Sequence, residues 1–186
     1  MRFFQFRLIL LVKRLRRRLR LAITTVPTAK DAVLIVQLLG IYALVATPLA
    51  LMSGLTTVNF ADLTWPQQGL VATRVLVFPA FIEEGIWRVL WLPHKTERVS
   101  DRQRWLMGLP TLALFVAMHP LNGITLYTAA AGTFSHPVFL CLTTLLGLFC
   151  MVSYWRSGSW WVPTMIHWAI VVAWLLMFSG YEQLHD

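Results

Sequence analysis

Two adjacent carboxylates and an arginine interrupt an apolar stretch of the chain, FIEEGIWRVLW at residues 81–91. Glu84 and Arg88 are four residues apart, so on a helix they share a face and can form an ion pair. Glu83 is rotated by about 100° from Glu84, so Arg88 cannot serve both acids equally. We therefore expect Glu83 to face a polar cavity.

Two histidines lie in other apolar stretches, His119 in FVAMH and His167 in TMIHW. A carboxylate beside a histidine can deprotonate a water molecule for attack on a carbonyl carbon. A second histidine or an amide can then stabilise the oxyanion. Glu and His are also zinc ligands, which makes a metal site an alternative, but the chain contains no HExxH pair and no GxSxG elbow. We predict hydrolytic chemistry with no metal and no cofactor.

The same residues allow a purely structural interpretation. Glu84 and Arg88 could form only an ion pair, and each histidine could pack against a backbone carbonyl. In a bilayer, however, each ionisable group near the centre costs about 2.5–3.5 kcal/mol on insertion scales. A structural pair needs one acid and this segment has two, so a functional site is favoured over packing alone.

The composition places these stretches in a membrane. Hydrophobic residues make up 58% of the 186 positions and charged residues 13%, whereas soluble domains average roughly 45–50% apolar and 25% charged residues. The two cysteines are too few for a disulfide framework. We expect an all-α integral membrane protein with about five transmembrane helices of roughly 20 residues.

The helices that must position the site follow from the apolar segments. We predict membrane spans at 32–53, 70–92, a segment ending near His119, 138–155 and 160–178. Pro110 suits the first turn of the third span. At 1.5 Å per residue, Glu83, His119 and His167 then lie about 10–13 Å from the same membrane face. Three helices would thus bring them to one level.

The first 30 residues form a region of their own. Eight of the 16 Lys and Arg residues fall within positions 1–20, where they alternate with Phe, Leu, Ile and Val. This pattern predicts a basic amphipathic helix on an anionic lipid surface, followed by a multi-pass domain over 31–186. With so large an apolar body, nucleic acid is not an expected partner. The basic loops predict a cytoplasmic N-terminus, and we expect a multi-pass protein of a bacterial cell membrane.

Three motifs occur in a fixed order along the chain. EEGIWR fits EExxxR, FVAMH fits FxxxH, and SWWVPTMIHWAIV is similar to an apolar helix that follows Gly-Ser-x-Trp and carries a histidine. Together they resemble the CPBP family of intramembrane glutamic proteases, which includes CAAX prenyl endopeptidases and bacteriocin-processing proteins. The resemblance covers about residues 70–175.

The resemblance implies a role for each motif residue. Glu83 would be the general base that activates water, His119 would lie beside that water, and Glu84 with Arg88 would orient the site. Phe115, the first residue of FxxxH, is expected to contact the substrate. That substrate would be a membrane-anchored peptide or protein within the lipid bilayer.

The last motif departs from the family pattern HxxxN or HxxxD. His167 would stabilise the oxyanion, but Val171 stands where the family has an amide or acid, and valine donates no hydrogen bond. Loss of one oxyanion donor typically lowers kcat by about 10²–10³. Asn122, beyond Pro120 on the third span, is a candidate replacement and a predicted substrate contact.

Two functions therefore stay open. One is an endopeptidase that cleaves a membrane-associated peptide near the cytoplasmic face. The other is a catalytically impaired relative that acts as a binding or scaffold partner. A transporter ranks last, because the chain has no visible inverted repeat.

Overall fold

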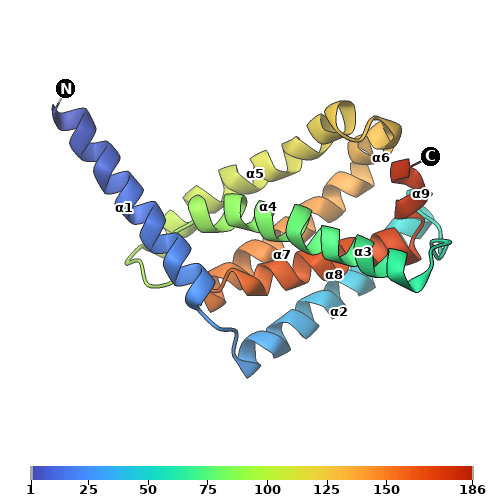
Figure 1. Cartoon of the computed structure of the whole chain (residues 1–186), viewed down its shortest axis with the longest axis horizontal. Coiled ribbons are helices and arrows are strands. Elements are labelled where there is room, and N and C mark those ends of the chain that lie inside the picture. The colour runs from blue at the N-terminus through green and yellow to red at the C-terminus, as the bar shows by residue number, and fades with distance from the viewer. Residues whose placement is uncertain (1, 186) are drawn as a thin grey trace.

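The computed structural model describes residues 2–185, and this part of the chain is helical apart from its connections (Figure 1). The α-helices are α1 Arg2–Thr24, α2 Ala29–Met52, α3 Trp65–Val75, α4 Ile82–Glu84, α5 Asp101–Thr125, α6 Ala131–Ser135, α7 Pro137–Ser157, α8 Trp161–Met177 and α9 Gly180–His185. Two π-helical segments, η1 Leu76–Phe81 and η2 Gly85–Leu90, flank α4, and a 3₁₀ turn, η3 Thr128–Ala130, precedes α6. The all-α prediction is confirmed.

Three helices are long and apolar enough to cross a bilayer, α2, α5 and α7, and α8 is a shorter apolar helix. α2 begins at a capping box, in which Thr28 and Asp31 each accept a hydrogen bond from the backbone N–H of the other. A hydrophobic helix of about 20 residues matches the thickness of the hydrocarbon core. These lengths indicate an integral multi-pass membrane protein.

The helix that carries His119 begins earlier than the sequence analysis predicts. α5 starts at Asp101, because Ser100 and Gln103 form a capping box in which each side chain accepts the other residue's backbone N–H. Pro110 therefore lies inside the helix, and its placement in a first turn is wrong. The capping residues, and not the proline, set the start of this helix.

The segment predicted as one span over 70–92 is broken near its middle. Phe78 has φ −140° and ψ 118°, outside the helical region, and the following peptide bond to Pro79 is cis. A proline removes one backbone donor and pushes the preceding residue toward extended geometry, so a straight helix cannot continue here. The acidic pair lies after the break, on α4, and the helical segment continues through η2 to Leu90.

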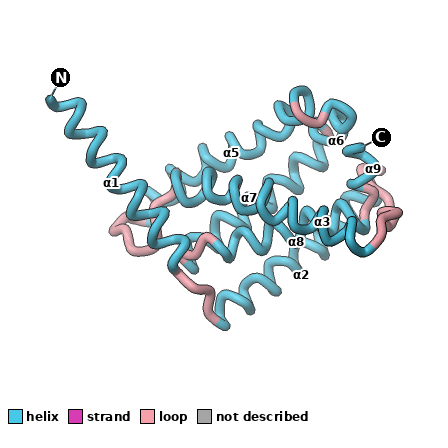
Figure 2. The backbone as a smooth tube through the Cα atoms, viewed as in Figure 1, coloured by secondary structure: helices cyan, strands magenta, loops and turns pink. Residues whose placement is uncertain are grey.

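α7 and α8 pack against each other at the centre of the bundle (Figures 1 and 2). α2 lies against both of them, α5 lies against α7, and α3 with η1 lies against α8. Gly147 permits the close approach of α5 and α7, because a Cβ there would lie 2.6 Å from a methyl carbon of Leu112. At the end of the bundle nearest α1, a core cluster joins Ala22, Val89, Leu92, Leu112, Phe115, Met151 and Tyr154.

α1 projects from the bundle, and only its last turns contact the other helices (Figure 1). Ala22 is completely buried, whereas the apolar side chains of 8–12 are exposed. Arg18 holds the docked end in place, since its Nε and Nη2 donate to the two carboxylate oxygens of Glu97 over 2.5 and 2.8 Å. Its Nη1 also donates to the carbonyl of Leu90 over 3.1 Å. The predicted basic helix is present, and part of its apolar face packs on protein.

The docking of α1 is expected to depend on pH. Burial alone would raise the pKa of Glu97, but hydrogen bonds from Arg18 and from the backbone N–H of His94, with the charge of Arg14, lower it below its ordinary value. A lowered folded-state pKa stabilises the docked helix above the unfolded pKa of about 4.3, and this stabilisation is lost as the pH falls through the folded value. For a partly exposed pair it amounts to about 1 kcal/mol or less.

Spin-label distances between Leu11→Cys and Arg102→Cys would measure this effect. We expect one narrow distance distribution at neutral pH and a broader one in acid, below about pH 4. Glu97→Gln should broaden the distribution at neutral pH and remove its dependence on pH. An unchanged distribution in acid would show that the ion pair does not hold α1.

The other end of the bundle is covered by α9. The Thr56 hydroxyl donates to the carbonyl of Phe178, which lies between α8 and α9. Gln183 joins two further segments, because its Nε2 donates to the carbonyl of Leu55 over 2.9 Å and its Oε1 accepts from Thr133 over 3.1 Å. The loop after α2 and the helix α6 are thereby tied across this end.

Candidate functional site

Glu84, Arg88 and His167 form a buried polar cluster. His167 Nδ1 lies 2.9 Å from Glu84 Oε1, and Arg88 Nε lies 3.0 Å from Glu84 Oε2. The Arg88 contact is an ion pair without an aligned hydrogen bond, because neither atom has a hydrogen-bond partner within residues 2–185. The three side chains are at most 2% exposed. Glu84 thus bridges the guanidinium of Arg88 on η2 and the imidazole of His167 on α8.

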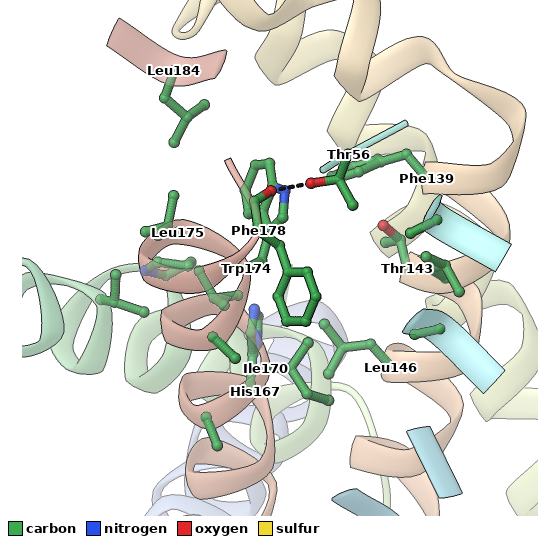
Figure 3. A pocket seen from close by; sticks show the side chains of 18 of the residues that line it. Thr56, Phe139, Thr143, Leu146, His167, Ile170, Trp174, Leu175, Phe178 and Leu184 are labelled. Carbon is green, nitrogen blue, oxygen red and sulfur yellow. Dashed lines mark hydrogen bonds between the residues drawn. The ribbon is translucent and has the colours of Figure 1, made fainter. Parts of the chain in front are cut away.

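Glu83 lines a cavity of about 570 Å³, to which His167 of this cluster also contributes. Residues of α2, α3, α5, α7, α8 and α9 line the cavity, which is mostly apolar. Figure 3 shows His167 at one side of it and Thr56 and Leu184 at the other, with Phe178 and Ile170 between them. Glu83 and His167 are thus ionisable groups in a mostly apolar space.

The cavity lies on one side of the polar residues only. Among the described residues, none from 5–38, 84–118 or 147–166 lines it. On that side the core cluster next to α1 fills the interior. The cavity therefore extends from the polar residues toward the end covered by α9, away from α1.

His119 reaches the same cavity from α5. Its Nδ1 lies 2.9 Å from the carbonyl oxygen of Phe115, which can only accept, so this nitrogen carries the proton. His167 is similar, since its Nδ1–H donates to the Glu84 carboxylate. In both imidazoles Nδ1 is used within the protein, so Nε2 is the nitrogen that can contact a molecule in the cavity. The structure thus brings together Glu83, His119 and His167, which the sequence analysis selects from three separate segments.

Trp160 packs against the helical segment that carries Glu83 and Glu84. Its ring stacks on Phe81 with centroids 4.2 Å apart and an interplanar angle of 6°, and its Nε1 donates to the Phe81 carbonyl over 2.9 Å. The indole occupies the space over Gly85, where a Cβ would lie 2.2 Å from a ring carbon. The backbone N–H of Trp160 donates to the carbonyl of Ala22 over 2.9 Å. One residue thus connects α1 with the acidic turn.

The comparison with known families decides what this arrangement belongs to. A family model described as type II CAAX prenyl endopeptidase Rce1-like matches residues 64–173. That is more than half of the 186 residues. The chain belongs to this family. No curated protein and no solved structure matches the chain significantly.

The Rce1-like region begins at the N-cap of α3 and ends within α8. It contains Glu83, Glu84, Arg88, His119 and His167. The helices α1, α2 and α9 lie outside it, although α2 and α9 both line the cavity. The family resemblance inferred from the three motifs is therefore confirmed, and the cavity includes elements beyond the matched region.

Val171 and its candidate replacement as oxyanion donor, Asn122, both line the cavity. Val171 follows His167 by one helical turn and shares its face of α8. Asn122 lies on α5, which continues as a helix through Pro120. The side-chain amide of Asn122 makes no hydrogen bond within the described residues, so it is available to a ligand.

Phe115 lies behind the cavity and not at its wall. It is fully buried in the core cluster next to α1 and does not line the cavity. Its ring lies 4.9 Å from Arg88 Cζ and its carbonyl accepts from His119, so it supports two residues of the site from behind. The substrate contact expected of Phe115 stays a prediction, and the burial of its ring in the core cluster does not favour that contact.

Sequence reasoning missed much of the cavity wall. Phe134, Phe139 and Trp174 surround the open side of His119, with ring centroids of Phe134 and Phe139 at 6.1 and 5.8 Å from the imidazole. Aromatic residues are common throughout this chain, so no spacing marks these three. Within residues 2–185 no three His, Cys, Asp or Glu side chains are close enough to hold a metal ion.

Proposed function

We propose that the chain is an intramembrane endopeptidase that hydrolyses a membrane-associated peptide with water activated by Glu83. One observation carries this proposal: Glu83, His119 and His167, from three different helical segments, line a single apolar cavity. Ionisable groups in membrane segments face protein interiors or water and mark functional sites. Membership of a protease family supports the same chemistry.

The reaction follows from the protonation of these groups. The Glu83 carboxylate takes a proton from a water molecule as the water oxygen attacks the carbonyl carbon of the scissile peptide bond. His119 Nε2, which carries no proton, accepts the second hydrogen of this water and orients it. The tetrahedral intermediate collapses when the peptide nitrogen leaves with the proton that Glu83 received. The products are a new carboxylate and a new amine.

His167 and Glu84 stabilise the charge that develops on the carbonyl oxygen. To donate to an oxyanion, His167 Nε2 must hold a proton in addition to the one on Nδ1. The Glu84 carboxylate, 2.9 Å from Nδ1, orients the imidazole, and Arg88 fixes the position of Glu84. Asn122, which also lines the cavity, is the candidate for a second donor in place of the amide that is absent at Val171.

The placement in the membrane is part of this proposal. The chain crosses the bilayer about five times, with the broken segment 65–90 as the second crossing. The N-terminus and the basic loop 93–104 lie in the cytoplasm, as the positive-inside rule requires, and the membrane is that of a bacterial cell. The exposed basic residues Lys13, Arg14, Arg16, Arg17 and Arg20 of α1 face anionic lipid headgroups.

Cleavage in proteoliposomes tests the proposal. Wild type would be incubated with a library of membrane-anchored peptides, and the products would be identified by mass spectrometry. Glu83→Gln removes the base with little change in shape and should lower kcat by about 10²–10⁴-fold. Asp62→Asn, an equal charge change in an exposed loop, should leave kcat unchanged. Cleavage that persists in Glu83→Gln would refute the role of Glu83.

A second function has one observation in its favour. Val171 lines the cavity where the family pattern places a hydrogen-bond donor, so the site holds fewer oxyanion donors than that pattern requires. A relative with this defect would bind a membrane peptide in the cavity without cleaving it. Binding of the same peptides to wild type with no products would favour this function.

A further inference from the structure

Arg74 is a cation at the wall of the cavity. It lies on α3, and it lines the same cavity as Glu83, His119 and His167. No other Lys or Arg among the described residues does so. The neighbouring wall is apolar, with Val71, Val75 and Phe78 on the same helical segment. A ligand in this part of the cavity thus meets one positive charge beside apolar side chains.

Arg74 has no partner within the described part of the chain. Arg18 and Arg88 each form an ion pair with a glutamate, whereas no ion pair or hydrogen bond involves the Arg74 guanidinium. Arg74 is nine residues past Trp65, where α3 begins, which corresponds to about 13 Å along the helix. Arg74 is exposed, so its guanidinium is open to a ligand at the wall of the cavity.

We propose that Arg74 is a substrate subsite that binds a carboxylate of the peptide in the cavity. This inference rests on the proposed function and adds the chemistry of the substrate. A guanidinium pairs with a carboxylate through two parallel hydrogen bonds, and in apolar surroundings such a pair is stronger than in water. The preferred substrate is an extended apolar peptide with one acidic group.

The spacing along the segment 65–90 sets the position of that acidic group. Arg74 and Glu83 are nine residues apart on either side of the break at Phe78, and nine residues of helix span about 13 Å. An extended peptide advances roughly 3.3 Å per residue, so this distance corresponds to about four residues. The carboxylate therefore lies about four residues from the cleaved bond, toward the end of the bundle that α9 covers.

Binding to an inactive protein tests the subsite without any need for proteolysis. Glu83→Gln in lipid nanodiscs would be titrated with three short fluorescent Leu/Ala peptides that differ in one residue, Asp, Asn or Lys. We expect the Asp peptide to bind roughly tenfold or more tightly than the Asn peptide. Adding Arg74→Gln should remove this preference, and adding Arg74→Glu should reverse it in favour of the Lys peptide.

Control variants separate this result from general electrostatics and from folding. Arg98→Gln removes an equal charge from an exposed loop and should leave the preference intact. The melting temperature of each variant establishes that it is folded. Equal binding of the three peptides, or no binding of any of them, would overturn the subsite.

A lipid phosphate is the competing ligand, and the same experiment identifies it. If Arg74→Gln changes the affinity for anionic lipid but leaves the preference among peptides unchanged, Arg74 serves lipid and the inference fails. If the preference for the Asp peptide depends on Arg74 but wild type cleaves none of the peptides, the proposed subsite is supported and the proposed proteolysis is refuted. The two proposals thus have separate outcomes.

Discussion

Replacement of Glu84 by leucine is expected to lower the free energy of unfolding by about 3–5 kcal/mol, because it strands the buried Arg88 guanidinium without a counter-ion. Arg88 is 1% exposed and has Glu84 as its only ion-pair partner in residues 2–185. The leucine also removes the acceptor for His167 Nδ1. Thermal unfolding in detergent would measure the loss.

The double variant Glu84→Leu/Arg88→Met is the matched control. Replacing both members of a buried pair by apolar residues of similar volume is often neutral, so most of the lost stability should return. Glu84→Gln should be milder than Glu84→Leu, because its amide oxygen still accepts from His167. A double variant as unstable as Glu84→Leu would show that lost packing, and not the stranded charge, causes the effect.

Val171→Asn is expected to raise the rate of peptide cleavage by about 10²–10³-fold over wild type, since it adds an oxyanion donor. Val171 lines the cavity one turn after His167, so an amide at this position faces the same space. The gain should appear in kcat under single-turnover conditions, because the new hydrogen bond strengthens as charge develops on the oxygen.

Two variants make this result specific. Val172→Asn introduces the same side chain at a neighbouring position that does not line the cavity, and it should give no gain. Asn122→Ala tests the residue that would otherwise supply the donor. If Val171→Asn is folded and no faster than wild type while Asn122→Ala is inactive, then Asn122 already fills the role and the predicted gain is wrong.

The polar part of the site could be predicted because charge is rare in this sequence. Glu83, Glu84 and Arg88 are conspicuous in an apolar segment, and the geometry of a helix alone separates the two acids. The structure places Glu84 against Arg88 and Glu83 in the cavity, which agrees with that reasoning. Their catalytic roles remain predictions that the variants above would test.

The shape around the polar residues was less accessible to sequence reasoning. The break at Phe78 has a local cause in Pro79, yet the π-helical turns on both sides of α4 have no sequence signal. The burial of Phe115 depends on how α5 rotates against α7, which a spacing rule does not determine. The closure of one end by α9 depends on contacts of Gln183 with two distant segments.

Substitutions at Gly85 and Trp160 depend on each other, because the two residues are in close contact. A side chain at Gly85 would overlap the indole, and the indole in turn stacks on Phe81 beside the acids. A change at Gly85 is therefore tolerated only after Trp160 has become smaller, and the reverse order passes through a destabilised intermediate. This epistasis fixes the order of mutations around the acidic pair, including positions that EExxxR leaves free. Directed evolution of this site would gain from varying both positions together.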